Sequence, residues 1–193
     1  MLEKFKNWAL LESQRKRGEY LTYAIAFIDS SFFPITPLFL LAPLAFASEG
    51  RKWIRLALLT TLFSVLGGYL GYIIGYYFYE LIGRPIIEFF NFSEEMARFQ
   101  ELFNTYAFWA IFLGAFVPIP YKVFTIGSGL FQTNLFVFTL ASLLGRGIRF
   151  LVIAYLSKRF GPAALRILLT MPRIPLIIIF VGALILLTFI FRP

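Results

Sequence analysis

The chain has 193 residues, of which 60% are hydrophobic and 15% charged, and it carries a formal net charge of +8. A soluble domain of this length cannot bury so much apolar surface, 25 phenylalanines included, so the composition indicates an integral membrane protein. The chain contains no cysteine or histidine, which excludes disulfides, Cys/His metal sites and histidine-dependent nucleophiles.

The first 19 residues are predicted to form an amphipathic helix that lies on the membrane surface. On a helix, apolar side chains such as Phe5 and Trp8 group on one face, opposite basic side chains such as Lys4 and Arg15. Such a helix binds the anionic lipid headgroups of the cytoplasmic leaflet, which would place the N-terminus in the cytoplasm. The segment lacks the apolar core and the cleavage site of a signal peptide.

Five apolar stretches follow along the chain. They are residues 20–47, 53–79, 105–133, 135–157 and 174–191. The second and fourth are long enough to cross ~30 Å of hydrocarbon as single helices, and the fifth is predicted to be a C-terminal transmembrane anchor within residues 161–193. The connection 80–104 contains the helix start Ser93-Glu94-Glu95 and is predicted to hold a short surface helix.

Prolines interrupt the first and third stretches near their middle. Pro34 and Pro37 divide the first stretch, and Pro118 and Pro120 divide the third. The resulting pieces, about 11–14 residues each, are too short to cross a bilayer alone. Irregular backbone at membrane depth is tolerated only where protein covers it or water bathes it. We therefore predict two structural hairpins that dip into the membrane and return, with their tips together near the midplane.

The two halves of the chain repeat the same order of elements. Each has a broken segment, a short turn and a full span, in residues 20–79 and 105–160, and one traverse between them inverts the second half. The predicted fold is an all-α integral membrane domain. It is an inverted repeat of two re-entrant helical hairpins, each followed by a transmembrane helix, with residues 20–160 as its core. Broken segments that span the membrane would also satisfy the positive-inside rule, so that alternative stays open.

Charged residues inside the apolar stretches are candidates for function. Asp29 precedes the first pair of prolines, and Arg146 and Arg149 share a helix face with Ser142. An arginine facing lipid at mid-span costs at least ~2.5 kcal/mol, so we expect both arginines to face the interior. They either bind substrate or form a structural ion pair with Asp29. Asp29 could also be a proton site, because burial raises the pKa of a carboxyl group while a nearby cation lowers it.

The second pair of prolines is followed by features of an anion site. The prolines are expected to end one half-helix, and the next would begin with free amides near Tyr121, beside Lys122. A helix N-terminus next to a cation attracts anions. Gly127 and Gly129 allow close approach by a ligand or a neighbouring helix. This stretch is predicted to bind phosphate; the alternative is that Lys122 only snorkels to the outer interface.

The span 53–79 has two further patterns. Gly67, Gly71 and Gly75 recur at every fourth residue, which predicts close packing of another helix. Tyr69 and Tyr72 also share a helical face and are deep enough in the span to line a polar cavity.

Two motifs carry a family resemblance. "FVPIPYKVFTIGSGLF" at 116–131, followed by "LASLLGRGIRF" at 140–150, resembles the DedA family, also called VTT or SNARE-associated Golgi proteins, and within it the YqaA-like branch. The resemblance covers about residues 20–160. It implies an inverted repeat with two re-entrant hairpins and a role in moving lipids; some members transport undecaprenyl phosphate, and eukaryotic relatives scramble phospholipids.

By the family pattern, Asp29 matches the acidic position of the first hairpin, and Lys122 stands near an arginine of the second. The chain departs from the better-studied branch in two ways. It has no second acidic residue in 35–47, and it has Ala115 where that branch has an arginine.

The predicted function is a lipid transporter or flippase of the bacterial cytoplasmic membrane. Its substrate would be a phosphate-bearing lipid, either a carrier lipid like undecaprenyl phosphate or a phospholipid, with proton coupling left open. One alternative is a passive phospholipid scramblase. A membrane-embedded enzyme is weaker, because one intramembrane carboxylate offers no acid/base pair. No cofactor, metal or nucleic-acid partner is predicted, and a homo-oligomer is left open.

Overall fold

The computed structural model of the chain describes residues 16–31, 36–116 and 120–161. The predicted C-terminal anchor lies outside these ranges, as do most of the predicted N-terminal surface helix and the prolines Pro34 and Pro118. Within them every regular element is helical, which confirms the all-α prediction.

The described residues form a series of helices along the chain. They are α2 (Lys16–Ser31), α3 (Leu38–Ala47), α4 (Lys52–Phe78), the π-helical turn η1 (Tyr79–Gly83), α5 (Arg84–Phe89), α6 (Ser93–Phe116), α7 (Lys122–Leu130) and α8 (Leu135–Phe160). The described part of α2 already includes residues 16–19, which the sequence assigned to the surface helix.

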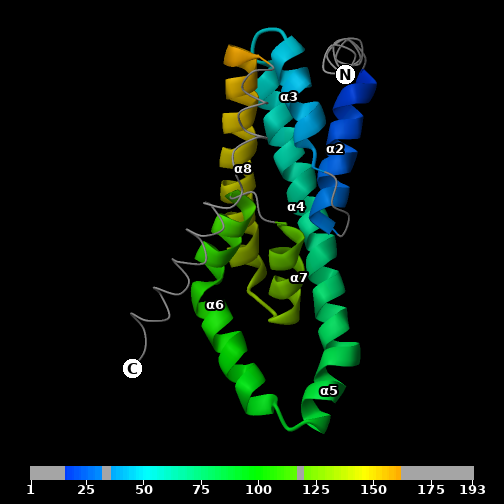
Figure 1. Cartoon of the computed structure of the whole chain (residues 1–193), viewed down its shortest axis with the longest axis vertical. Helices are drawn as coiled ribbons and strands as arrows, with labels where there is room; N and C mark the ends of the chain where they lie inside the picture. The colour runs from blue at the N-terminus through cyan, green and yellow to red at the C-terminus, as the bar shows by residue number, and fades with distance from the viewer. Residues whose placement is uncertain (1–15, 32–35, 117–119, 162–193) are drawn as a thin grey trace.

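The helices form an elongated bundle whose two ends are the α3–α4 turn and the α5–α6 turn (Figure 1). Helix α2 runs from the first end to the middle of the molecule, and α3 runs back to that end. Helix α4 passes along the whole bundle and continues through η1 into α5. Helix α6 then returns to the middle, α7 turns back from there, and α8 runs to the first end.

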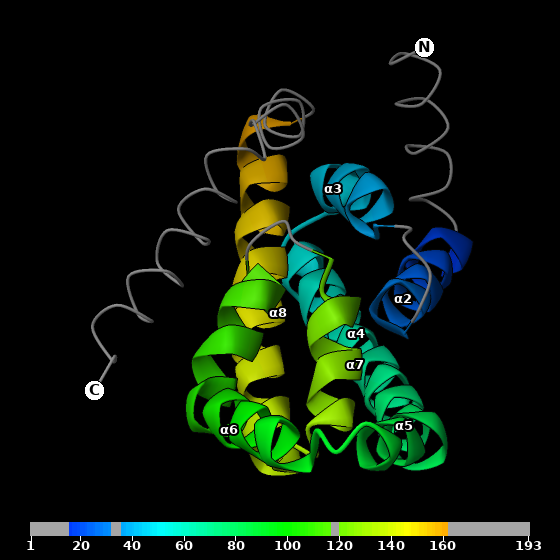
Figure 2. The same ribbon diagram turned by 60° about the horizontal axis from the view of Figure 1, so that its bottom comes forward.

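Two long helices organise the packing. Helices α2 and α7 both pack along α4, whereas α3 and α6 both pack along α8, and α4 and α8 pack against each other (Figure 2). Among the described residues, two helical segments are long and apolar enough to cross a membrane, Lys52–Phe89 and Leu135–Phe160. They contain the two full spans that the sequence predicted.

Glycines on α4 allow its neighbours to approach closely. A Cβ atom at Gly67 would overlap the carbonyl oxygen of Phe27 on α2, and one at Gly75 would overlap the carbonyl oxygen of Ile126 on α7. Helix α7 has the reciprocal feature, because a Cβ atom at Gly129 would overlap the carbonyl oxygen of Tyr72 on α4. The predicted close packing at the glycine repeat is confirmed, and it brings both α2 and α7 onto α4.

The expectation of a short surface helix after Ser93 is wrong, because α6 runs unbroken for 24 residues. Its polar first half and apolar second half share one helical register. Phe103, Ala107, Ile111 and Ala115 are spaced by four residues and pack in one core cluster with Phe138 and other residues of α7 and α8. The change in polarity therefore marks a change in surroundings along one helix rather than the end of a helix.

Gly75→Ala is expected to lower the free energy of unfolding by roughly 1–3 kcal/mol, because its methyl group would force α7 away from α4. Gly127→Ala is the matched control. Nothing lies within 4 Å of a Cβ atom at Gly127, so alanine should leave stability unchanged or raise it by up to ~1 kcal/mol. Thermal unfolding of the detergent-purified variants measures both effects, and equal melting temperatures would contradict the packing role of Gly75.

Candidate functional site

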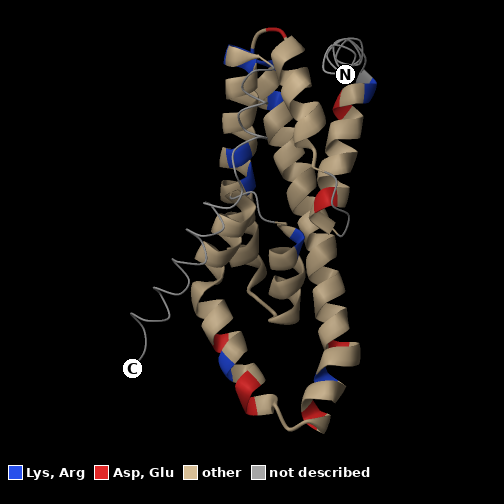
Figure 3. Cartoon of the chain, in the orientation of Figure 1, with Lys and Arg blue, Asp and Glu red and all other residues tan. Residues whose placement is uncertain are grey.

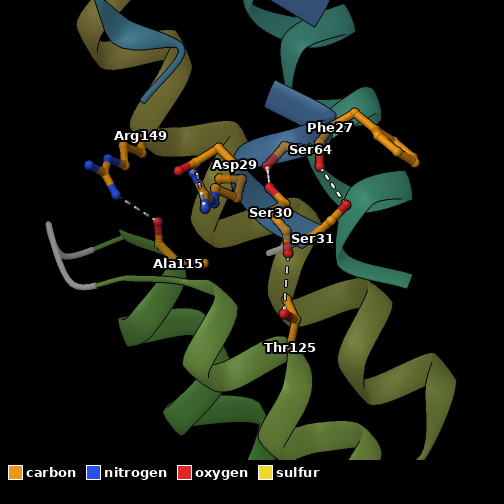
Figure 4. A network of polar contacts seen from close by, with 9 residues as sticks. Phe27, Asp29, Ser30, Ser31, Ser64, Ala115, Thr125 and Arg149 are labelled. Atoms are coloured by element: carbon orange, nitrogen blue, oxygen red, sulfur yellow. Dashed lines mark hydrogen bonds and ion pairs between the residues drawn. The ribbon is translucent and has the colours of Figure 1, made fainter. Parts of the chain in front are cut away.

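The C-terminal end of α2 and the start of α7 meet at the middle of α4. The Thr125 hydroxyl on α7 donates a hydrogen bond to the Ser30 carbonyl oxygen on α2, at 3.2 Å (Figure 4). The Ser30 and Ser64 hydroxyl oxygens lie 2.7 Å apart, and the Ser31 hydroxyl donates to the Gly67 carbonyl oxygen at 3.1 Å. These hydroxyls satisfy backbone and side-chain groups that lipid could not hydrogen-bond, so they hold the two half-helices in place.

An ion pair joins α2 to α8 beside this junction. The Nη1 and Nη2 atoms of Arg146 each lie 3.4 Å from Oδ2 of Asp29. The Arg146 side chain is only 4% exposed and that of Asp29 is 19% exposed. Both nitrogens approach the same oxygen, at distances longer than the roughly 2.7–2.9 Å of a tight charge-assisted hydrogen bond. The pair is therefore buried but loose.

Aromatic rings surround the Arg146 guanidinium. Its Cζ atom lies 4.2 Å from the centroid of the Tyr121 ring and 5.6 Å from that of the Phe150 ring. Tyr121 is buried, and its hydroxyl donates a hydrogen bond to the Ser142 hydroxyl, one turn before Arg146 on α8. Within the described part of the chain, the buried Nε atom of Arg146 has no hydrogen-bond partner.

The second arginine of α8 contacts the end of α6. Nη1 of Arg149 donates to the carbonyl oxygen of Ala115 at 3.5 Å (Figure 4). The family resemblance implies an arginine at position 115, and here an arginine from another helix reaches the backbone of that position. Lys122, at the start of α7, is partly exposed and lies within electrostatic reach of Asp29, as do Arg146 and Arg149.

These four charged residues form a cluster of three cations and one carboxylate. Figure 3 shows that charged residues gather at the two ends of the bundle, with a few in its middle. In the described part of the chain, Arg146, Arg149 and Lys122 all lie within electrostatic range of the Asp29 carboxylate. Positive charge at this depth is costly in an apolar environment unless an anion balances it. The arrangement is suited to receiving an anionic group.

The start of α7 differs in part from the expected anion site. The amide of Val123 donates to the Pro120 carbonyl oxygen at 3.1 Å, and that of Phe124 donates to the Tyr121 carbonyl oxygen at 2.9 Å. The prediction of free amides is wrong at these two residues, because the first turn of α7 closes on the carbonyls that precede it. The prediction of an anion site therefore depends on the Lys122 side chain.

The remaining candidate residues are two glycines of α7 and two tyrosines of α4, and most of them contact neighbouring elements. Gly129 packs against the backbone of α4, whereas nothing lies within 4 Å of the Cβ position of Gly127. The Tyr69 hydroxyl is hydrogen-bonded to Thr139, and the Tyr72 hydroxyl donates to the Thr133 carbonyl oxygen at 2.8 Å. These two tyrosines tie α4 to α8 and to the turn before it.

Sequence reasoning missed the hydroxyl-bearing residues of the junction and the aromatic ring that follows Arg146. They are Ser30, Ser31, Ser64, Thr125 and Phe150. Small hydroxyl residues inside apolar segments were a usable signal, because such residues hydrogen-bond between membrane helices. Within the described ranges, no group of three or more His, Cys, Asp or Glu side chains is placed to hold a metal ion.

Comparison with known proteins assigns the chain to a family. The family model of the VTT domain matches residues 33–159. The chain belongs to the VTT-domain family. This confirms the resemblance to the DedA family, whose members include two of the relatives below. The YqaA-like branch stays a prediction.

Three bacterial proteins are similar in sequence to this chain. An uncharacterized protein of Haemophilus influenzae is 31% identical over 83% of this chain and 81% of its own length. Undecaprenyl phosphate transporter A of Staphylococcus aureus is 27% identical over 68% of this chain and 69% of its own length. The uncharacterized protein YqeD of Bacillus subtilis is 30% identical over 67% of this chain and 60% of its own length. No solved structure matches the chain.

Asp29→Ala and Arg146→Ala are expected to be strongly non-additive. Each single change strands a buried charge and should cost roughly 3–5 kcal/mol of unfolding free energy, whereas the double variant should be no less stable than either single one. Thermal unfolding in detergent of the wild type, the two single variants and the double variant measures this coupling. The exposed pair Arg84–Glu88, at 3.0 Å, is the matched control and should show no measurable coupling. Additive losses at Asp29 and Arg146 would contradict a buried pair.

Proposed function

We propose that this VTT-domain protein is a lipid transporter that moves a phosphate-bearing lipid across the bacterial cytoplasmic membrane. The observation that carries the proposal is the cluster of three cationic side chains around one carboxylate where α2, α7 and α8 meet, in the middle of an apolar bundle. A lipid phosphate supplies the matching negative charge. A relative named undecaprenyl phosphate transporter A supports the same substrate class, and its name supports a transporter rather than an enzyme.

The architecture we propose is an inverted repeat with two re-entrant hairpins, α2–α3 and α6–α7. The contact pattern supports it, because α2 packs on α4 as α6 packs on α8, and α7 packs on α4 as α3 packs on α8. In this pattern, α2, α3 and α4 of the first half correspond to α6, α7 and α8 of the second half. In transporters built this way, the binding site lies near the bilayer midplane, at the interface between the repeats.

The two ends of the bundle differ in charge, and this difference supports an orientation. The α3–α4 end carries the described cations Arg17, Arg51, Lys52, Arg55, Lys158 and Arg159. The α5–α6 end is mainly acidic, with Glu80, Glu88, Glu94, Glu95 and Glu101 against Arg84 and Arg98. By the positive-inside rule, we propose that the first end and the N-terminus face the cytoplasm.

The proposed mechanism is an exchange of anions at Arg146. In the structure, Asp29 pairs with Arg146 through a single carboxylate oxygen. A lipid phosphate would compete for the guanidinium, with Lys122 and Arg149 nearby to bind its other oxygens. A displaced Asp29 would become free to take up a proton, which would couple transport to the proton gradient.

A passive scramblase is the second candidate function, because Asp29 already has a structural partner in Arg146 and need not carry protons. Reconstitution in liposomes separates the two. Polyprenyl phosphate movement that responds to an imposed pH gradient, and loses that response in Asp29→Asn, supports coupled transport. Bidirectional movement independent of the gradient supports a scramblase, and no movement of any phosphate-bearing lipid would refute the proposed function.

Lys122→Gln is expected to weaken binding of polyprenyl phosphate by about ten- to a hundredfold, because a charge-assisted hydrogen bond contributes roughly 1.5–3 kcal/mol. Lys122→Arg keeps the charge and should retain most of the affinity. Lys52→Gln makes the same change at the exposed start of α4 and is the matched control. Binding is measured with the purified protein and a fluorescent polyprenyl phosphate. Equal affinity of wild type and Lys122→Gln would remove Lys122 from the site.

Single cysteines test the topology, and the natural chain has none to remove. Arg17→Cys and Glu49→Cys should both react with a membrane-impermeant maleimide from the cytoplasmic side, because a re-entrant hairpin returns the chain to the side it left. Glu94→Cys, at the other end of the bundle, should react from outside. Labelling of positions 17 and 49 from opposite sides would show that the first broken segment spans the membrane.

A further inference from the structure

Arg146 contacts an aromatic ring as well as its ion-pair partner. The guanidinium lies 4.2 Å from the Tyr121 ring centroid, within the range of a cation–π contact, whereas its two hydrogen bonds to Asp29 are both 3.4 Å long. Tyr121 is 2% exposed, so no water screens this contact. The ring belongs to the residue that directly precedes α7, and the ion-pair partner Asp29 belongs to α2.

The Tyr121 ring is itself fixed relative to α8. Its hydroxyl donates to Ser142, which precedes Arg146 by one helical turn, and Ser142 is fully buried. The ring is therefore held at its hydroxyl by one residue of α8 while its face contacts the guanidinium of another. A side chain held in this way restricts the plane in which the guanidinium can lie.

We propose that Tyr121 is a positioning residue that keeps Arg146 in its phosphate-binding orientation when Asp29 releases it. The inference rests on the proposed function, and it gives Tyr121 the role of a support for the arginine rather than of a direct ligand of the phosphate. Among the described residues, the buried Nε atom of Arg146 has no hydrogen-bond partner, so the guanidinium has donor capacity that Asp29 does not use. A phosphate oxygen could take that donor while the ring keeps the guanidinium in place.

The physical reason for such a support is the exchange itself. An arginine held only by Asp29 would follow the carboxylate or rearrange when the pair opens, and each binding event would then have to order a long side chain again. A cation–π contact does not use the N–H donors in the guanidinium plane, so it persists while the in-plane partner changes from carboxylate to phosphate. Tyr121 would thus hold the arginine side chain in place, while the carboxylate or the phosphate neutralises its charge.

Binding of fluorescent polyprenyl phosphate to detergent-purified variants of the full chain tests the inference. Tyr121→Leu removes the ring face and should weaken binding by about three- to thirtyfold, the range for a desolvated cation–π contact. Tyr121→Phe and Ser142→Ala keep the ring but remove the hydroxyl bond that anchors it to α8, so both should weaken binding by less than Tyr121→Leu does. Tyr121→Trp should also bind, because tryptophan offers a stronger aromatic face. Tyr121→Met takes the place of the leucine variant if that variant does not fold.

The outcomes separate a positioning role from a structural one. A positioning role predicts weaker phosphate binding in Tyr121→Leu, unchanged binding of a neutral polyprenol, and a smaller loss in Tyr121→Phe. Equal binding in wild type and Tyr121→Leu, or equal losses in the leucine and phenylalanine variants, would overturn the inference. If Lys122→Gln loses affinity while Tyr121→Leu does not, only the inference fails. If the wild-type chain binds no phosphate-bearing lipid, the proposed function fails as well.

Discussion

The structure depends on the burial of charge in the middle of an apolar bundle. Arg146 is 3% exposed, and a guanidinium at that depth is stable only if the protein replaces the water it has lost. Its replacements come from separate elements, namely the Asp29 carboxylate on α2 and the ring of Tyr121, the N-cap residue of α7. Helices α2, α7 and α8 must therefore all be in place before the charge is compensated.

Short half-helices can meet at this point because glycines of α4 allow their backbones to approach its own. Helix α7 has nine residues, too few for a stable isolated helix, so packing and hydrogen bonds must hold it. Gly75 on α4 and Gly129 on α7 bring the two backbones into contact, and Thr125 then reaches the Ser30 carbonyl oxygen on α2. The same close packing that stabilises the half-helices thus places Asp29 and Tyr121 beside Arg146, so stability and the candidate site are linked.

Local patterns predicted much of the fold. They failed where a change in polarity was interpreted as the end of a helix and where the amides at a helix start were expected to be free. Proline positions indicated where the half-helices begin, and the four-residue glycine repeat indicated that another helix packs closely on the span 53–79, because both act on the adjacent backbone. The pattern after Ser93 misled, since a change from polar to apolar residues was interpreted as a helix end, although α6 continues through it. The amides of Val123 and Phe124 were expected to be free, but the first turn of α7 uses them itself.

The sequence by itself determined the class of protein, the two full spans, the broken segments and the identity of the charged residues inside apolar stretches. These properties depend on composition and on the period along one helix. Only the tertiary structure decided that Arg146 pairs with Asp29, 117 positions away, that it lies over Tyr121, and that Arg149 reaches Ala115. Such partnerships depend on how far each helix is rotated and shifted against the next. That placement is set by contacts between backbones, which no pattern along a single helix records.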